Sequence, residues 1–206
     1  MPDPQRLDPH EGPLEPDGDF DGLVFTGVRL DGQDGSRARF LECALVGCVL
    51  DDARLDHARF IDTTLTEVRA GVLGIAGSTW QDCAWETCRL GAVEAYGTEW
   101  IRTEVRGGKI DYLNLRDAQL DDVRLVGCVV DELDLAHASV RRLTLEDCRV
   151  RRLDVTGAKL TDVDLRGLTG LEHVAGVGGL AGATITSDQL LDLAPHLAAH
   201  LGIEVR

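Results

Sequence analysis

Apolar residues recur at every fifth position over most of the chain. The series begins at Phe20 and ends at Leu165, Gly35 is its only exception, and every Phe and Trp residue belongs to it. An amphipathic helix would need a period near 3.6, and a half-buried strand a period of 2. A strict period of five indicates that each pentapeptide repeats one conformation and turns the chain by a fixed angle. We therefore expect residues 20–170 to form a solenoid whose neighbouring coils bury one another's apolar side chains.

A second inward position lies two residues before each apolar one and holds mostly small side chains. The cysteines all occupy it: Cys43, Cys48, Cys83, Cys88, Cys128 and Cys148. We expect them to be small buried thiols, because none has Cys-x-x-Cys spacing. Cys128 and Cys148 would stack on adjacent coils, so a disulfide between them is the alternative.

A period of 20 lies on top of the period of five. It is clearest in one aromatic series, Phe20, Phe40, Phe60, Trp80 and Trp100. Residues that stack on successive coils share one environment, so four pentapeptides per coil predict a four-sided tube with an aromatic column inside. Stacking at strand spacing gives a rod of roughly 36 Å. Around Gly35, either a degenerate repeat or a short projecting loop over Asp31–Arg39 fits the pattern.

The repeats resemble those of the pentapeptide-repeat family, whose consensus is a small residue, Asp or Asn, Leu or Phe, and two variable residues. The segments ARLDH, ARFID, LNLRD, AQLDD and AKLTD carry the resemblance. Few of the second positions hold Asp or Asn, but the central apolar series is intact. The resemblance implies an all-β solenoid, a right-handed quadrilateral β-helix, which we expect to end in a short α-helical cap.

The two ends differ from the repeats. Residues 1–19 hold most of the prolines and six acidic residues, which predicts a disordered acidic arm. Residues 171–206 predict a helical cap or dimerisation segment, with Ser187 as N-cap, Pro195 breaking the helix or starting a second one, and Gly202 at the stop. Its broad apolar face consists of Leu190, Leu191, Leu193, Leu197 and Leu201.

Charge and motifs narrow the function. The formal net charge of −15 argues against binding to nucleic acid or to an anionic membrane surface. The sequence shows no signal peptide or membrane span, so we expect a cytoplasmic protein. It has no P-loop, dinucleotide fingerprint or nucleophile–base set, and His196 and His200 lack the Glu of a zincin motif. We expect no cofactor, no metal and no enzymatic activity.

One acidic column is the remaining clue. Arg102 and Arg142 interrupt it, and its carboxylates are Glu42, Asp62, Asp82, Asp122 and Asp162. The simpler interpretation is a solvated surface with weak ion pairs. The more specific interpretation is that the rod imitates DNA. The repeat region, however, averages one net negative charge per roughly 5 Å of its length, whereas duplex DNA carries one per about 1.7 Å. Imitation would therefore depend on this one acidic face.

The family resemblance gives that face a possible partner. It implies binding to a type II topoisomerase, especially DNA gyrase, and protection from quinolone or peptide antibiotics. Size and C-terminal helix are similar to those of the family's mycobacterial fluoroquinolone-resistance member, which implies a homodimer. Loops project from the family's plasmid-borne resistance members, and only Asp31–Arg39 is a candidate here. The alternative is a structural or interaction scaffold with an unknown protein partner.

Overall fold

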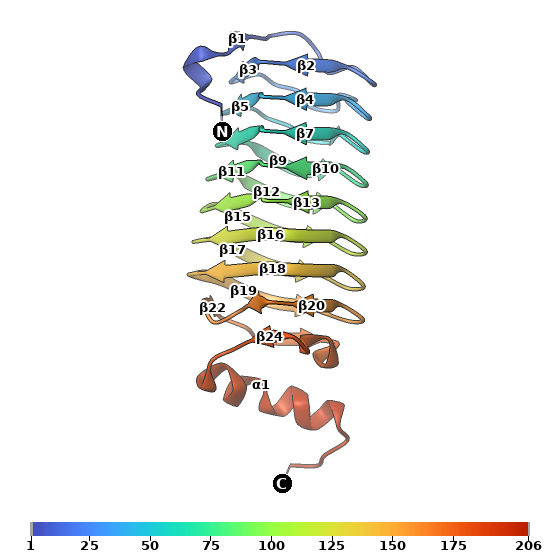
Figure 1. Cartoon of the computed structure of the whole chain (residues 1–206), viewed down its shortest axis with the longest axis vertical. Helices are drawn as coiled ribbons and strands as arrows, with labels where there is room; N and C mark the ends of the chain where they lie inside the picture. The colour runs from blue at the N-terminus through green and yellow to red at the C-terminus, as the bar shows by residue number, and fades with distance from the viewer. Residues whose placement is uncertain (1, 206) are drawn as a thin grey trace.

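The computed structural model describes residues 2–205 and is a parallel β-solenoid of about eight turns that ends in one α-helix. Figure 1 shows the coils stacked along one axis, with the N-terminus near one end and the helix at the other. All strand pairs are parallel, and through most of the rod partners are 20 residues apart, as in Phe60↔Trp80 and Trp80↔Trp100. Each coil therefore contains four pentapeptides, as the sequence predicts.

The strands form four faces. Face one contains β2 (Asp19–Asp21), β4 (Arg39–Leu41), β7 (Arg59–Ile61), β10 (Thr79–Gln81), β13 (Glu99–Ile101), the first halves of β16 (Gln119–Val126) and β18 (Ser139–Glu146), and β20 (Lys159–Thr161). Face two contains β1 (Asp8–Pro9), β3 (Leu23–Thr26), β5 (Ala44–Val46), β8 (Thr64–Thr66), β11 (Ala84–Glu86), β14 (Glu104–Arg106), the second halves of β16 and β18, β21 (Val163–Asp164) and β24 (Ala183–Thr184).

Faces three and four share a second sheet, because its longer strands run around the corner between them. Its strands are β6 (Ala53–Arg54), β9 (Arg69–Gly74), β12 (Arg89–Glu94), β15 (Lys109–Asn114), β17 (Val129–Asp134), β19 (Cys148–Asp154), β22 (Leu168–Thr169) and β23 (His173–Ala175). The remaining elements are two 3₁₀ helices, η1 (Pro4–Arg6) and η2 (Val177–Leu180), and the helix α1 (Ser187–His200).

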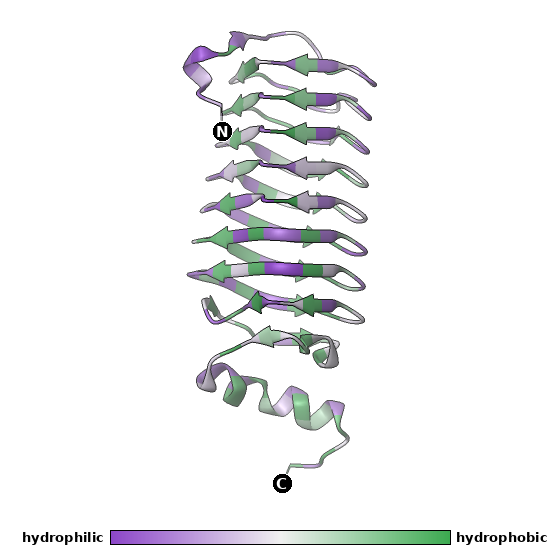
Figure 2. Ribbon diagram, in the orientation of Figure 1, coloured by the Kyte–Doolittle hydropathy of each residue, from purple (hydrophilic) through white to green (hydrophobic). Residues whose placement is uncertain are grey.

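The apolar series fills the inside of the tube. Figure 2 shows apolar segments at the same place on successive coils. The rings of Phe20, Phe40, Phe60 and Trp80 stack with centroid distances of 4.8, 4.6 and 3.8 Å, whereas Trp100 is tilted at 6.3 Å from Trp80. The predicted aromatic column is thus confirmed.

The corners explain the polar positions. Two residues after each central residue the backbone usually has positive φ, as at Glu42 (50°), Asp62 (47°) and Gly47 (64°). Gly adopts this left-handed region freely, and Asp and Asn adopt it more readily than most residues. The corner between faces three and four is different, because Val72 and its equivalents in β12, β15, β17 and β19 keep negative φ. The chain there stays extended.

The inward cysteines are free thiols that bond to the backbone. Cys43 Sγ lies 3.4 Å from the Phe20 carbonyl oxygen and 3.3 Å from that of Leu41, and Thr63 Oγ1 makes the equivalent bonds one coil later. Burial raises the pKa of Cys83 to about 12. Cys128 and Cys148 are also free, and hydrogen bonding to the Cys148 sulfur, with burial, raises the pKa of Cys128. Small buried thiols, not a disulfide, fill this position.

The N-terminal segment is not a disordered arm, so that expectation is corrected. Asp8 and Pro9 pair with β3, and the His10 ring lies 4.8 Å from the ring of Phe25. Leu14 is buried, and its backbone N–H donates to Gln33 Oε1 at 2.7 Å. The physical reason is that the first coil exposes an apolar end and an unpaired strand edge, and the segment covers both.

Gly35 belongs to a degenerate repeat rather than a projecting loop. Its N–H donates to the Arg54 carbonyl at 2.8 Å, and Asp34 forms a parallel bridge with Arg54, so the register is kept. A Cβ on Gly35 would lie 2.9 Å from Leu55 Cδ2 and 3.4 Å from Leu14 Cβ. Leu14 therefore occupies the space left by the missing central side chain.

The solenoid also ends later in the chain than predicted. The solenoid extends past residue 170 to β24, which pairs with β21. The N-cap of α1 is Thr186, one residue before the predicted Ser187. Its Oγ1 accepts a hydrogen bond from the Gln189 N–H at 3.1 Å, as part of a capping box. Pro195 lies inside the helix and does not end it. No helix among residues 2–205 has the length and apolarity needed to cross a membrane.

Gly202 ends α1, as the sequence predicts. It has a φ of 70°, its N–H donates to the Ala199 carbonyl, and the Ile203 N–H donates to that of Ala198. This is the Schellman arrangement.

Candidate partner-binding surface

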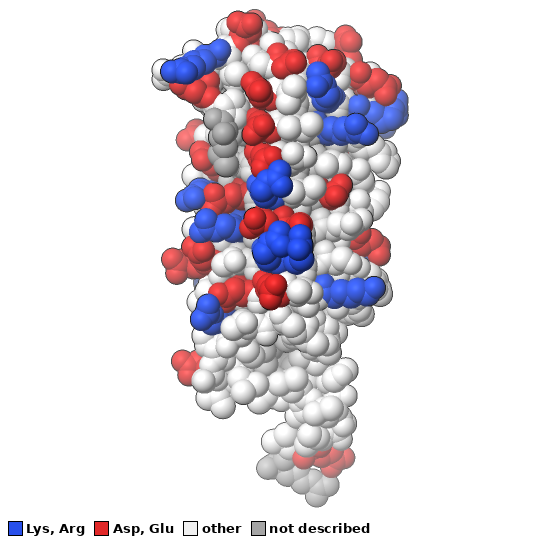
Figure 3. Space-filling model, in the orientation of Figure 1, with Lys and Arg blue, Asp and Glu red and all other residues white. Residues whose placement is uncertain are grey.

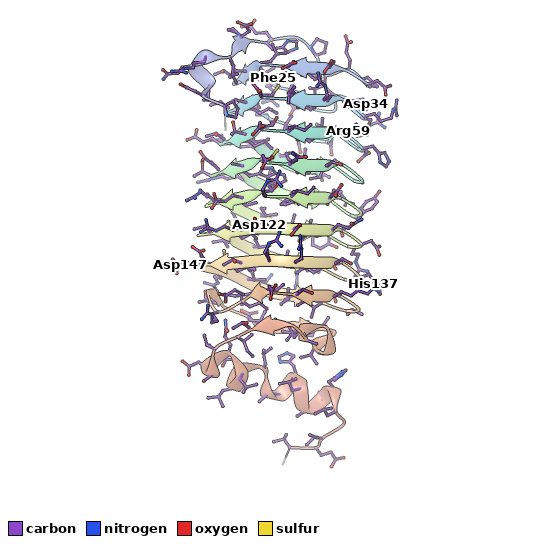
Figure 4. All side chains as sticks on the ribbon, viewed as in Figure 1. Phe25, Asp34, Arg59, Asp122, His137 and Asp147 are labelled. Atoms are coloured by element: carbon purple, nitrogen blue, oxygen red, sulfur yellow. The ribbon has the colours of Figure 1, made fainter. Side chains whose placement is uncertain are left out.

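The acidic column forms a ridge along the corner between faces one and two. We call Glu42, Asp62, Asp82, Arg102, Asp122, Arg142 and Asp162 the corner ridge. All have left-handed φ, which places their side chains outside the tube. Figure 3 shows carboxylates along this corner, interrupted by basic side chains, and Figure 4 places Asp122 on the same side. The structure thus brings the predicted residues into one ladder.

The two arginines divide the ridge. Arg102 Nε lies 2.5 Å from Asp82 Oδ1 and its Nη2 lies 2.7 Å from Oδ2, and this hydrogen bonding lowers the pKa of Asp82. Arg142 instead reaches Asp121 on face one at 2.6 Å. Asp82 is therefore already neutralised within the chain.

The other ridge carboxylates stay available. Within residues 2–205, no ion pair engages these four side chains: Glu42, Asp62, Asp122 and Asp162. The ridge thus offers a partner two carboxylates on neighbouring coils, Glu42 and Asp62, and two more separated by Arg142.

Uncharged side chains flank the N-terminal half of the ridge. Leu41, Ile61 and Ile101 are partly exposed on face one, whereas Ala44 and Ala84 on face two are buried. A partner that approached this corner would meet carboxylates beside one uncharged band on face one, which suits a protein surface better than a small ligand.

Many of the other surface charges form ion pairs between neighbouring coils. Arg39 pairs with Asp19, and Arg141 pairs with Asp121, each 20 residues apart. These groups are exposed, so each pair contributes little to stability. The solvated-surface interpretation holds for these ladders.

Sequence reasoning missed a buried polar group on face four. Asp134 has 3% of its surface exposed, and its carboxylate accepts from Arg116 Nε at 2.6 Å, from the Tyr112 hydroxyl at 3.2 Å and from the Ala136 N–H at 3.0 Å. No spacing signal separated this Asp from exposed ones, because its burial depends on Tyr112 from the previous coil. Its contacts are structural.

The apolar residues of α1 divide into two sets. Leu193 is buried and Leu197 packs partly on the core, so they cap the last coil. Gln189 Nε2 completes that cap by donating to the carbonyls of Leu165 and Leu168. Leu190 and Leu201 are 50% and 69% exposed and face away from the solenoid.

No metal site accompanies these surfaces within residues 2–205, where no group of three His, Cys, Asp or Glu side chains is arranged to hold an ion. The His196 ring packs at 5.9 Å from that of His173 and not from His200.

Two family models match the solenoid. The model described as pentapeptide repeats (8 copies) matches residues 36–69, and the pentapeptide repeat region model matches residues 109–173. A search of curated proteins gives no match.

The solved structures of two pentapeptide-repeat proteins are similar to this chain. HetL, a pentapeptide repeat protein involved in heterocyst differentiation regulation from the cyanobacterium Nostoc sp. strain PCC 7120, is 14% identical, with 83% of this chain and 90% of that chain covered at a TM-score of 0.37. QnrB1, a plasmid-mediated fluoroquinolone resistance protein, is 16% identical, with 87% and 89% covered at a TM-score of 0.32. A trypsin-treated QnrB1 variant is 13% identical, with 97% and 99% covered at 0.38.

At these identities and TM-scores the solved structures carry no argument about function. The matches to the repeat models, the unbroken period of five and the four pentapeptides in each coil agree with one another. The chain belongs to the pentapeptide-repeat family.

Proposed function

We propose that the chain is a non-catalytic binding protein that presents the corner ridge to a type II topoisomerase, above all DNA gyrase, as a DNA-like rod. The observation that carries the proposal is the set of ridge carboxylates without an internal partner, aligned along an unbranched solenoid. A protein groove built for duplex DNA is lined with basic side chains, and such a groove attracts an acidic rod. The family resemblance supplies the choice of topoisomerase.

The function needs no cofactor, metal or nucleic acid, and it belongs in the cytoplasm, where bacterial gyrase works. Protection of the enzyme from quinolone or peptide antibiotics would follow if the rod competes with DNA at the site where the drug traps the cleaved duplex.

We also propose a homodimer through α1. Leu190, Leu191 and Leu201 are 50%, 72% and 69% exposed on a helix that already caps the last coil with its opposite side. Pairing of two such helices would bury these side chains and join two rods end to end, which doubles the length of the acidic surface.

The alternative is an interaction scaffold for a different protein. Arg102 neutralises Asp82 in the middle of the ridge, and Leu41 and Ile61 beside it are uncharged. Both features suit a partner that buries apolar surface next to a short acidic segment, rather than one that follows an unbroken line of charge. The pentapeptide fold is compatible with either role.

The test is a gyrase supercoiling and cleavage assay titrated with the chain, with and without a fluoroquinolone. The critical variant is Asp62→Arg with Asp122→Arg, since the ridge itself accepts arginine at residues 102 and 142. The matched control is Asp117→Arg with Asp147→Arg, which makes the same charge change at left-handed positions outside the ridge. Figure 4 shows Asp147 projecting from another corner.

We expect the wild-type chain and the control to inhibit supercoiling or to reduce drug-induced cleavage, and the ridge variant to lose this effect. Equal activity of both variants would refute the ridge as the contact. No effect of the wild-type chain on gyrase from its own source would reject the topoisomerase and leave the scaffold, whose partner affinity capture would then identify.

A further inference from the structure

A ladder of cations on face three is incompletely neutralised. Arg69, Arg89 and Lys109 begin β9, β12 and β15 and are register partners, so they stack at about 4.8 Å, the spacing of paired strands. All three are exposed. Within residues 2–205, Arg69 and Arg89 take part in no ion pair. Like charges directly opposite each other on neighbouring strands are destabilising, so this arrangement needs an explanation.

Other coils of the same ladder show what is missing. Arg29 pairs with Asp31 at 2.8 Å, and Lys109 pairs with Asp111 at 2.6 Å, in each case with the carboxylate two residues further on. In β9 and β12 that position holds Gly71 and Gly91. Arg149, which is followed two residues later by Arg151, likewise forms no ion pair within residues 2–205. Within that range, only β9 and β12 of this ladder place two such guanidinium groups on neighbouring coils.

The glycines also leave open space. A hollow of about 570 Å³ lies over Gly91 and is lined by Arg89, Leu90, Gly91, Gly108, Lys109 and Asp111. A Cβ on Gly91 would collide with the Gly71 carbonyl oxygen, and one on Gly108 with that of Cys88. The backbone therefore keeps the hollow free of side chains.

We propose that Arg89 and Lys109, which line the hollow over Gly91, bind a phosphate group there. Phosphate carries a charge of about −1.5 to −2 at neutral pH, which offsets the charge of Arg89 and of its register neighbour Arg69, neither of which forms an ion pair within residues 2–205. The guanidinium group of Arg89 and the ammonium group of Lys109 both donate, and a tetrahedral phosphate has enough acceptor oxygens for both. The volume accommodates free phosphate or a small phosphomonoester.

Nearby carboxylates limit the affinity without closing the site. Asp111 at the rim is paired with Lys109, and Asp51 Oδ1 accepts from the Gly71 N–H at 2.7 Å. Glu67 lines a second hollow of about 290 Å³ on the other side of Arg69 and Arg89. These acids and the net charge of −15 predict weak binding, for which an NMR titration is suited.

The experiment is a ¹H–¹⁵N NMR titration of the full chain with inorganic phosphate, with ionic strength held constant by chloride. We expect saturable shifts centred on Gly91, Gly108 and the Arg89 side chain. Arg89→Gln should weaken binding about tenfold, the loss of one charge-assisted interaction. Arg59→Gln is the matched control, because Arg59 is exposed without an ion pair on face one. Absence of saturable shifts at Gly91, or equal loss in both variants, would overturn the site.

Titrations with two further ligands, methyl phosphate and acetate, identify the class of ligand that the site binds. Methyl phosphate that binds as well as inorganic phosphate indicates a phosphomonoester ligand, and its exclusion indicates free phosphate. Acetate that binds equally would overturn the assignment to phosphate. In chloride alone, Arg89→Gln should raise the midpoint of thermal unfolding, because it relieves repulsion from Arg69. Added phosphate should raise the midpoint of the wild type only. A lower midpoint for the variant in chloride would mean that Arg89 is structural.

Discussion

At the residue scale, the solenoid combines strongly apolar inward positions with a few hydrogen-bonded polar groups, although Trp85 Nε1 and Trp100 Nε1 are buried without a partner. Central residues such as Phe40 and Trp80 are completely buried, and the inward Cys and Thr side chains donate to backbone carbonyls. Asp134 is the exception among the carboxylates, since only 3% of it is exposed. Its three hydrogen bonds make it the polar residue whose loss should matter most.

Asp134→Asn should destabilise the chain by about 1–3 kcal/mol, because Arg116 loses a charged acceptor in a buried setting. Urea unfolding followed by circular dichroism measures this change. Asp17→Asn breaks the exposed pair with Arg37 and should leave the free energy of unfolding almost unchanged. Similar losses in the two variants would contradict the special role of burial.

The buried thiols should be unreactive in the folded chain. Burial raises the pKa of Cys83 to about 12 and of Cys88 to about 11, so little thiolate forms at pH 8. We expect a thiol reagent to leave Cys83 and Cys88 unlabelled in buffer and to label both in guanidinium chloride. Fast labelling in buffer would show that the coils open.

The same shifts set a pH dependence. The Cys83 thiol ionises near pH 9 when unfolded, whereas in the folded chain its pKa is raised to about 12. Its contribution to stability is therefore complete below pH 9 and is lost as the pH rises from there. Cys83→Ala should unfold with a smaller dependence on alkaline pH than the wild type.

At the element scale, the two ends use different devices to close the tube. The N-terminal segment supplies one strand, β1, and two inserted side chains, His10 and Leu14. The C-terminal end uses α1, whose Gln189 side chain bonds to two carbonyls of the last coil. Both devices cover an apolar layer that an open solenoid would expose.

Leu14 and Gly35 should be energetically coupled, because one side chain fills the space of the other residue. Leu14→Ala should destabilise the chain by about 2–4 kcal/mol through the cavity it leaves. Gly35→Ala should be harmful alone and less harmful in the Leu14→Ala background. A double-mutant cycle measured by urea unfolding tests this, and strict additivity would contradict it.

Mutations on the two faces of α1 should have different effects, one on stability and the other on dimerisation. Leu193→Ala should lower the free energy of unfolding by about 2–3 kcal/mol, because that side chain is buried against the last coil. Leu191→Ser should leave monomer stability unchanged and weaken the proposed dimer in sedimentation velocity. A dimer that resists Leu191→Ser combined with Leu201→Ser would place the contact elsewhere.

At the scale of the whole molecule, charge is unevenly distributed around a uniform rod. Most basic side chains are paired with carboxylates on the same or the next coil, whereas Glu42 and Asp62 of the ridge are not. Asp52, Glu67 and Asp117 at other corners also form no ion pair within residues 2–205, so the ridge differs from them in stacking its carboxylates in one column. Face three carries the opposite sign at Arg69 and Arg89, so the two surfaces suit different ligands.

Inhibition of gyrase by the chain should weaken with salt, because the contact would depend on exposed charges. We expect the potency to fall about tenfold between low and moderate ionic strength, as for other electrostatically steered associations. The supercoiling assay repeated over a salt series measures this potency. An inhibitor that does not compete with DNA is the control for the enzyme's own response to salt. Salt-independent potency would favour an apolar contact at Leu41 and Ile61.

The repeat sequence alone predicts the coil, the inward positions, the aromatic column and the acidic corner. Each of these follows from one conformation repeated every five residues, so local pattern and long-range contact carry the same information. The family resemblance adds only the handedness of the coil, which it implies to be right-handed. Spacing was also sufficient for Gly202, since a left-handed helix end favours glycine.

The tertiary structure decides whatever depends on a single, non-repeated contact. Leu14 is buried only because Gly35 lacks a side chain, and Thr186 caps α1 because Gln189 reciprocates. Arg89 is left unpaired because the backbone at Gly91 lies too close to the previous coil for a carboxylate-bearing residue. These contacts join residues of different coils or of an end and a coil, so the period that reveals the rod gives no signal for them.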